Sequence, residues 1–87
     1  MNYLKVIGVN DLDKLSVEEM FLKIREFNQF SFYTVDEDYC IQLFDKEICA
    51  NDEVDCIAEF SATNVKRLLK SVIEDIAERE YCRIYDI

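Results

Sequence analysis

Acidic side chains and thiols are the chemically active groups that this chain supplies in number, and both gather in one segment. The stretch VDEDYCIQLFDKEICANDEVDC, residues 35–56, holds three of the four cysteines. From Asp36 to Glu59 there are nine acids and one base, Lys46, so this segment carries −8 of the chain's net charge of −9. A charge so localised attracts a positively charged partner and repels nucleic-acid phosphates. The sequence therefore predicts a basic protein partner and no direct binding of nucleic acid.

The four cysteines follow the spacing Cys40-x8-Cys49-x6-Cys56-x25-Cys82. Zinc sites use close pairs such as C-x2-C or nearby histidines, and this chain has no histidine. We therefore expect thiols that pack as small hydrophobic side chains. The number of cysteines is even, which leaves disulfides open if the protein is exported.

Catalytic fingerprints are missing from the sequence. Proton transfer usually employs histidine, and a cysteine nucleophile needs a base of that kind. The single glycine, Gly8, excludes a glycine-rich phosphate loop. The acids of DEDYCIQLFDKE, residues 36–47, lack the spacing and the glycine of an EF-hand. Asp36 and Asp38 could exchange protons with a substrate only inside a cleft, so we predict no enzyme, no metal and no cofactor.

Length and composition fit one domain that covers residues 1–87. An apolar fraction of 51% and eleven aromatic residues are enough for a hydrophobic core. No window approaches the roughly 18 apolar residues of a membrane span. The beginning of the chain, MNYLKVIGVND, lacks a basic head followed by a long apolar run. The prediction is a cytoplasmic protein, of a host or of a producing cell, without a membrane partner.

Two helices are predicted from caps and apolar periodicity. Ser16 and Glu19 form a capping box before a helix that ends near residues 27–28. Ser61 or Thr63 is expected to cap a second helix. Each helix carries one apolar stripe, made of Val17, Met20, Phe21 and Ile24 in the first and of Val65, Leu68, Leu69, Val72, Ile73, Ile76 and Ala77 in the second.

Strands are predicted over residues 3–9, 30–35, 39–44 and 54–60, with turns at 36–38 and 51–53. Residues 81–87 read as a final strand or as a helical extension. The predicted fold is a small α+β domain of order β-α-β-β-β-α, followed by a C-terminal β where the last residues form a strand. Its antiparallel sheet of three to five strands packs against two helices.

A three-residue turn at 36–38 would place Val35 opposite Tyr39 and put aromatic side chains on both faces of the sheet. Two helices on one face would leave the other face exposed, as an aromatic surface with an acidic rim. Two alternatives stay open. One helix could cover each face, or the register could differ by one residue, which turns every side chain to the opposite face.

We hypothesise an acidic stoichiometric inhibitor that docks on the basic nucleic-acid-binding site of a larger protein, such as a nuclease or another nucleic-acid-binding enzyme, partly by nucleic-acid mimicry. In size, acidity and class the chain is similar to phage or plasmid anti-defence proteins, including anti-CRISPR proteins, and to immunity proteins of nuclease toxins. The alternative is a small homodimeric structural or regulatory protein that pairs through the second sheet face or the last strand. The residues expected to bind the partner are the acids Asp36, Glu37, Asp38, Asp45, Glu47, Asp52, Glu53 and Asp55 and the aromatic anchors Phe30, Phe32, Phe44, Tyr33 and Tyr39.

Overall fold

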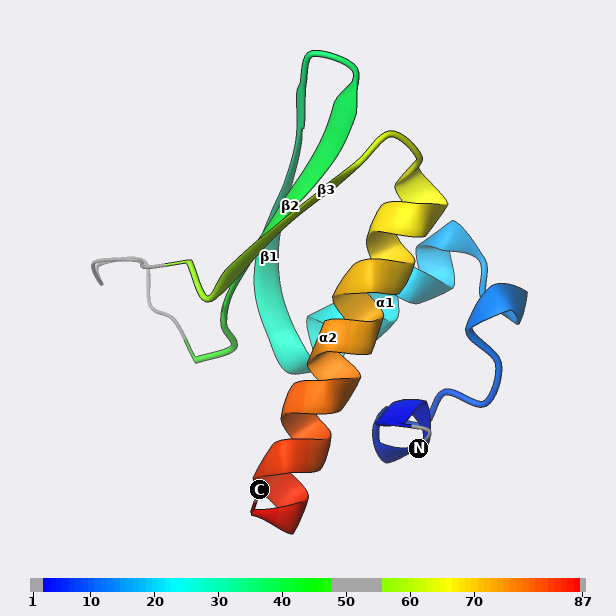
Figure 1. Ribbon diagram of the computed structural model, residues 1–87, viewed down its shortest axis with the longest axis vertical. Helices are drawn as coiled ribbons and strands as arrows, with labels where there is room; N and C mark the ends of the chain where they lie inside the picture. Colours follow the sequence, from blue (N-terminus) through cyan, green and yellow to red (C-terminus); the bar gives the residue numbers. More distant parts are fainter. Residues whose placement is uncertain (1–2, 48–55, 87) are drawn as a thin grey trace.

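Two helices and a three-stranded antiparallel sheet form the fold in a computed structural model, which describes residues 3–47 and 56–86 (Figure 1). The strands lie in the order β1-β2-β3. This confirms the predicted α+β class. The elements along the chain are the 3-10 helices η1 (Tyr3–Ile7) and η2 (Leu12–Lys14), α1 (Val17–Phe27), β1 (Asn28–Val35), β2 (Asp38–Asp45), β3 (Ala58–Ala62) and α2 (Val65–Tyr85).

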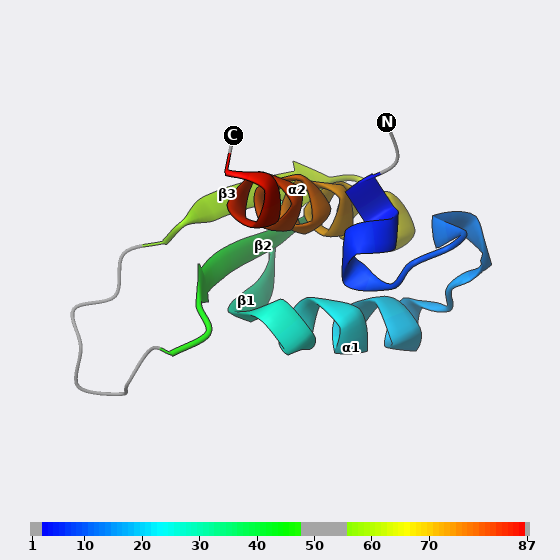
Figure 2. The same cartoon turned by 90° about the horizontal axis from the view of Figure 1, so that it is seen from below.

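Both helices lie on the same side of the sheet, with η1 packed against α2 (Figure 2). One core joins the helix layer to the sheet, because buried residues of α1, α2 and β2 belong to a single apolar cluster. The alternative with one helix on each face is therefore wrong. Among the described residues, no helix covers the second face of the sheet.

The predicted strand over residues 3–9 is wrong, because this segment forms η1 and a turn. Gly8 adopts a φ of 80°, in the left-handed region that suits glycine. The N–H groups of Gly8 and Val9 donate to the carbonyls of Lys5 and Leu4, at 3.1 and 3.0 Å. These local bonds satisfy the backbone without a neighbouring strand, while the segment still buries Val9 in the core.

Helix α1 begins as predicted. The Ser16 hydroxyl accepts from the N–H of Glu19 at 3.1 Å, and the Glu19 carboxylate accepts from the N–H of Ser16 at 3.0 Å. Met20 and Ile24 of its apolar stripe are fully buried. The capping box and the helix end at Phe27 are confirmed.

Helix α2 buries its stripe as predicted but begins later than expected. The strand β3 continues to Ala62, which pairs with Tyr39, so Ser61 lies in the strand and cannot cap the helix. Asn64 is the cap, and its side chain accepts from the N–H of Arg67 at 3.1 Å. The helix runs to Tyr85, so of the two alternatives for the end of the chain the helical extension is confirmed for residues 81–85.

The β1–β2 hairpin has a register one residue away from the one expected. Val35 pairs with Asp38, so the turn contains only Asp36 and Glu37. Asp36 adopts a φ of 55°, which an aspartate tolerates better than most side chains and which permits this tight turn. As a consequence, the side of the sheet that faces the helices carries Phe30, Phe32, Tyr39, Ile41 and Leu43, and the outer face carries Tyr33, Cys40, Gln42 and Phe44.

Candidate interaction surfaces

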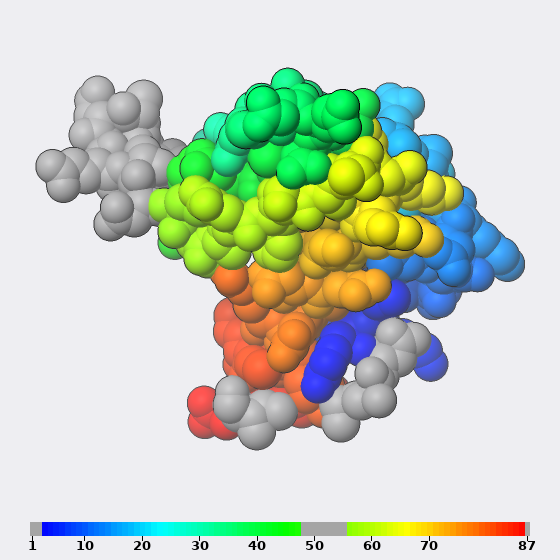
Figure 3. Space-filling model, turned by 45° about the horizontal axis from the view of Figure 1, so that its top comes forward, coloured from blue at the N-terminus to red at the C-terminus, as the bar shows by residue number. Residues whose placement is uncertain are grey.

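The tip of the β1–β2 hairpin extends past the start of α2 (Figures 1 and 3) and carries three consecutive carboxylates. Asp36, Glu37 and Asp38 are all exposed. Within the described ranges, no lysine or arginine lies within ion-pairing distance of any of them. Because nothing offsets these charges locally, the tip is a focus of negative potential.

Apolar side chains are exposed next to this tip. Phe32 is 41% exposed, Tyr33 36% and Val35 52%. Phe32 and Tyr33 point to opposite faces of β1, so an apolar contact is available on each side of the hairpin. A projecting element with unpaired charge and exposed aromatic rings has the composition of a partner-binding surface.

The aromatic rings on the helix side of the hairpin form a row. Phe21 of α1 stacks on Phe30 with the ring centroids 5.7 Å apart and meets Phe32 edge-on at 5.6 Å. Phe32 stacks in turn on Tyr39 at 6.0 Å. Phe30 and Phe32 therefore lie on the face that the helices cover, whereas Phe44 lies on the opposite face, so these three expected anchors do not share one surface.

The uncovered face of the sheet is mixed rather than aromatic. Gln42 donates to the Glu59 carboxylate across β2 and β3 at 2.7 Å, and Cys40 beside them is only 8% exposed. Tyr33 lies on this face, and its pKa is raised by desolvation and by the nearby charges of Cys40 and Glu59. Phe44 on the same face is half-buried.

The remaining predicted acids do not join the tip. Asp45 lies at the opposite end of β2, seven residue steps from Asp38, which corresponds to about 24 Å along a strand. The Glu47 N–H donates to the Asp45 carboxylate there at 3.1 Å, so these two acids form a local turn. Asp52, Glu53 and Asp55 lie outside the described residues.

The described thiols are free. Cys40 is buried, whereas Cys56 and Cys82 are half-buried. The Cys56 thiol donates to the carbonyl of Ala58 at 3.0 Å. Cys49 lies outside the described ranges.

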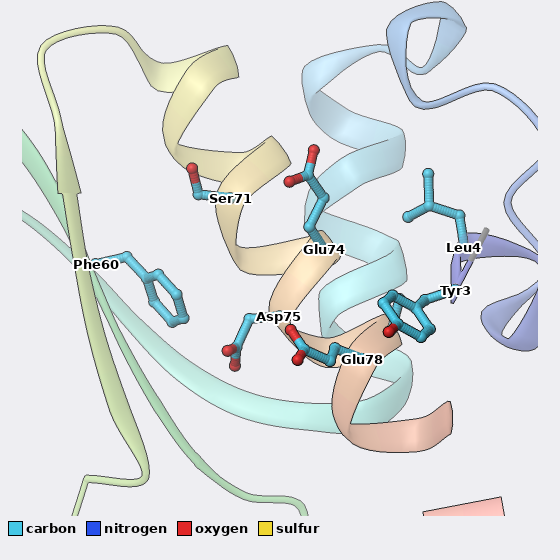
Figure 4. Close-up of a pocket in the computed structure, with 8 residues that line it drawn as sticks. Tyr3, Leu4, Phe60, Ser71, Glu74, Asp75 and Glu78 are labelled. Atoms are coloured by element: carbon cyan, nitrogen blue, oxygen red, sulfur yellow. The ribbon is translucent and has the colours of Figure 1, made fainter. Parts of the chain in front are cut away.

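A hollow of about 520 Å³ lies between η1, β3 and α2 (Figure 4). The rings of Phe60 and Tyr3 stand on either side of the Asp75 and Glu78 carboxylates in this view. Arg79 already pairs with Asp75 at 2.8 Å. Sequence reasoning missed the hollow, because its walls come from η1, β3 and α2, which only the folded chain brings together, although the close spacing of Glu74, Asp75 and Glu78 was visible.

The described part of the chain has neither a metal site nor a membrane-spanning helix. No group of histidine, cysteine or acidic side chains there has the arrangement of a metal site. No helix there has the length and apolar character needed to cross a membrane. Comparison with protein-family models, with curated proteins and with solved structures finds no match.

Proposed function

We propose that this protein is an acidic stoichiometric inhibitor that docks its β1–β2 hairpin tip on the basic, nucleic-acid-binding surface of a larger protein. The observation that carries the proposal is the tip itself, where Asp36, Glu37 and Asp38 are exposed and have no cationic partner among the described residues. A charge that the fold leaves unpaired remains available to a partner.

The target class follows from this charge. Arginine and lysine side chains arrayed for phosphates also bind carboxylates, because both ligands offer anionic oxygens. A protein that places three carboxylates on one projecting turn competes for such a site. Phage or plasmid anti-defence proteins and immunity proteins of nuclease toxins act on targets of this chemistry, which makes a nuclease the proposed partner.

The aromatic side chains beside the tip supply the second part of the proposed contact. Exposed Phe32 and Val35 lie within four residues of the turn but on opposite faces of β1, so a target that encloses the tip contacts both. Charged rims mainly accelerate association, whereas buried aromatic anchors mainly slow dissociation.

The experiment compares three immobilised proteins as baits for a lysate of candidate host cells. The baits are wild type, a tip variant (Asp36→Asn, Glu37→Gln, Asp38→Asn) and a matched control that removes the same charge elsewhere (Glu18→Gln, Glu74→Gln, Glu78→Gln). The expected result is capture of a nucleic-acid-binding protein by wild type and by the control, but not by the tip variant. Added duplex DNA should displace the captured protein, and moderate salt should weaken its binding steeply.

Equal capture by the tip variant, with circular dichroism showing all three baits folded, would contradict the proposal. Capture that is insensitive to DNA would contradict the competition with nucleic acid.

A further inference from the structure

Among residues 3–47 and 56–86, the strand β1 is an open edge of the sheet, and it lacks the usual protection. Its sequence, NQFSFYTV, contains no charged residue, no proline and no glycine, and Ser31 to Val35 are all exposed. Natural proteins usually protect an edge of this length with charges, proline or a bulge, because unpaired backbone groups there invite another strand. Figure 2 shows β1 as the outer strand on the side of α1.

The backbone groups that face this open edge can be identified from the sheet. The N–H of Ile57 donates to the carbonyl of Leu43 at 2.8 Å, so the Leu43 backbone points toward β3 and away from β1. Residues of an antiparallel strand alternate between its two neighbours. Phe30, which is opposite Leu43, therefore directs its N–H and C=O to the open edge, as do Phe32 and Thr34 at two-residue steps.

We propose that a second copy of this chain occupies the edge, with the two β1 strands antiparallel about a two-fold axis at Phe32. This register pairs Phe32 with Phe32 of the second copy and Phe30 with Thr34 of the second copy. All outward backbone groups then find partners, in about six hydrogen bonds, and one continuous six-stranded sheet results. The Phe32 rings of the two copies meet on the helix side, where each is 41% exposed in the isolated chain.

Charge complementarity supports a second copy as the occupant. The same register places Asp36 of one copy opposite Asn28 of the other. Asn28 lines a hollow of about 470 Å³ together with Arg25, Gln29, Phe30 and Lys46. Arg25 makes no ion pair with any described residue. Each acidic tip thus lies beside the hollow that Arg25 and Lys46 line next to the start of the other β1, while the two tips stay at opposite ends of the joined strands.

This inference does not rest on the proposed function. Glu37 and Asp38 lie beyond the paired strands, so a dimer still presents carboxylates at both of its ends. Phe32 and Asp36 belong to both proposed contacts, so a target and a second copy compete for them, whereas Glu37 and Asp38 stay available to a target in the dimer.

Sedimentation from low to several hundred micromolar concentration tests the dimer with two proline variants. Thr34→Pro removes an N–H that points to the open edge of β1. The hydrogen bonds between β1 and β2 therefore stay intact. Ser61→Pro is the matched control, because it removes an N–H that points to the open edge of β3. The neighbouring residue Phe60 forms its backbone hydrogen bonds with Ile41 of β2, so the backbone groups of Ser61 point away from β2. Wild type and Ser61→Pro should reach twice the monomer mass of 10.3 kDa, and Thr34→Pro should dimerise at least tenfold more weakly.

Amide hydrogen exchange of wild type provides a readout that does not depend on folding of the variants. The amides of Phe30, Phe32 and Thr34 should become protected as the concentration rises. Wild type that remains a monomer throughout would overturn the second copy as the occupant and leave the edge to a foreign strand. A dimer that loses stability in Ser61→Pro but not in Thr34→Pro would also overturn the proposal.

Discussion

The helical part of the molecule and the tip of the β1–β2 hairpin differ in the ion pairing of their charged side chains. Every ion pair given by the described residues joins side chains of the helices or of the segment before α1: Asp11 with Lys14, Lys23 with Glu26, Asp13 with Lys70, Asp75 with Arg79, and Glu80 with Arg83. The tip of the hairpin has three acids and no such pair. Exposed ion pairs add little stability, so their main effect is to cancel the local field. The negative field of the hairpin tip therefore remains, whereas ion pairs reduce the local field of the helices.

Burial separates β1 from the rest of the fold, because β2, the other strand of the hairpin, buries Cys40, Ile41 and Leu43. The helix α2 buries six residues completely or nearly so, whereas the last five residues of β1 are all exposed. The stability of the fold therefore comes from the helices and from β2. The hairpin projects from that support, and its outer residues are open to a partner.

The largest difference between the two regions should appear when apolar side chains are truncated. Ile73→Ala, in the fully buried stripe of α2, should reduce the free energy of unfolding by about 2–5 kcal/mol through lost packing and a cavity. Val35→Ala, at the exposed end of β1, should change it by less than about 0.5 kcal/mol. Urea denaturation followed by circular dichroism measures both. A large loss for Val35→Ala would mean that the hairpin end supports the fold and would remove the contrast.

A smaller effect is expected from the helix caps. Ser16→Ala and Asn64→Ala should each reduce the free energy of unfolding by about 0.5–2 kcal/mol, because each removes an acceptor for an N–H of the first helical turn. Thr63→Ala is the matched control for Asn64, because Thr63 was a predicted cap that the structure does not use. Thermal unfolding compares the three variants. A loss for Thr63→Ala as large as for Asn64→Ala would contradict the assignment of the cap.

Local signals in the sequence predicted the elements of the helical part well. The capping box at Ser16 and Glu19 and the apolar stripe of α2 each depend on residues within one or two helical turns, so spacing alone reveals them. The segment of η1 was predicted wrongly, because its apolar run fits a strand equally well. Only its packing against α2 and the turn at Gly8 decide between them.

The candidate surface was less predictable, because it depends on one turn. Whether the hairpin turn has two or three residues decides which rings face the helices, and the choice rests on the φ of Asp36. Acids that are close in the sequence also separate in space, since the length of β2 lies between Asp38 and Asp45. The hollow beside α2 could not be found from spacing, because Tyr3 and Phe60 reach it only in the folded chain.

The finest test of the comparison neutralises one acid in each region. Asp13 accepts from Lys70, and this hydrogen bond with the charge of Lys70 lowers the pKa of Asp13 below its usual 3.8. A carboxylate whose pKa falls on folding stabilises the fold above its usual pKa, and this contribution is lost as the pH falls through the lowered value. Asp13→Asn should therefore reduce stability slightly at pH 7, and the difference from wild type should disappear in acid.

Asp36→Asn should not reduce stability at pH 7, because it removes repulsion from Glu37 and Asp38 and asparagine also tolerates the φ of 55°. Urea denaturation at both pH values measures the two variants, and a loss for Asp36→Asn at pH 7 equal to that for Asp13→Asn would show that the tip acid serves the fold rather than a partner.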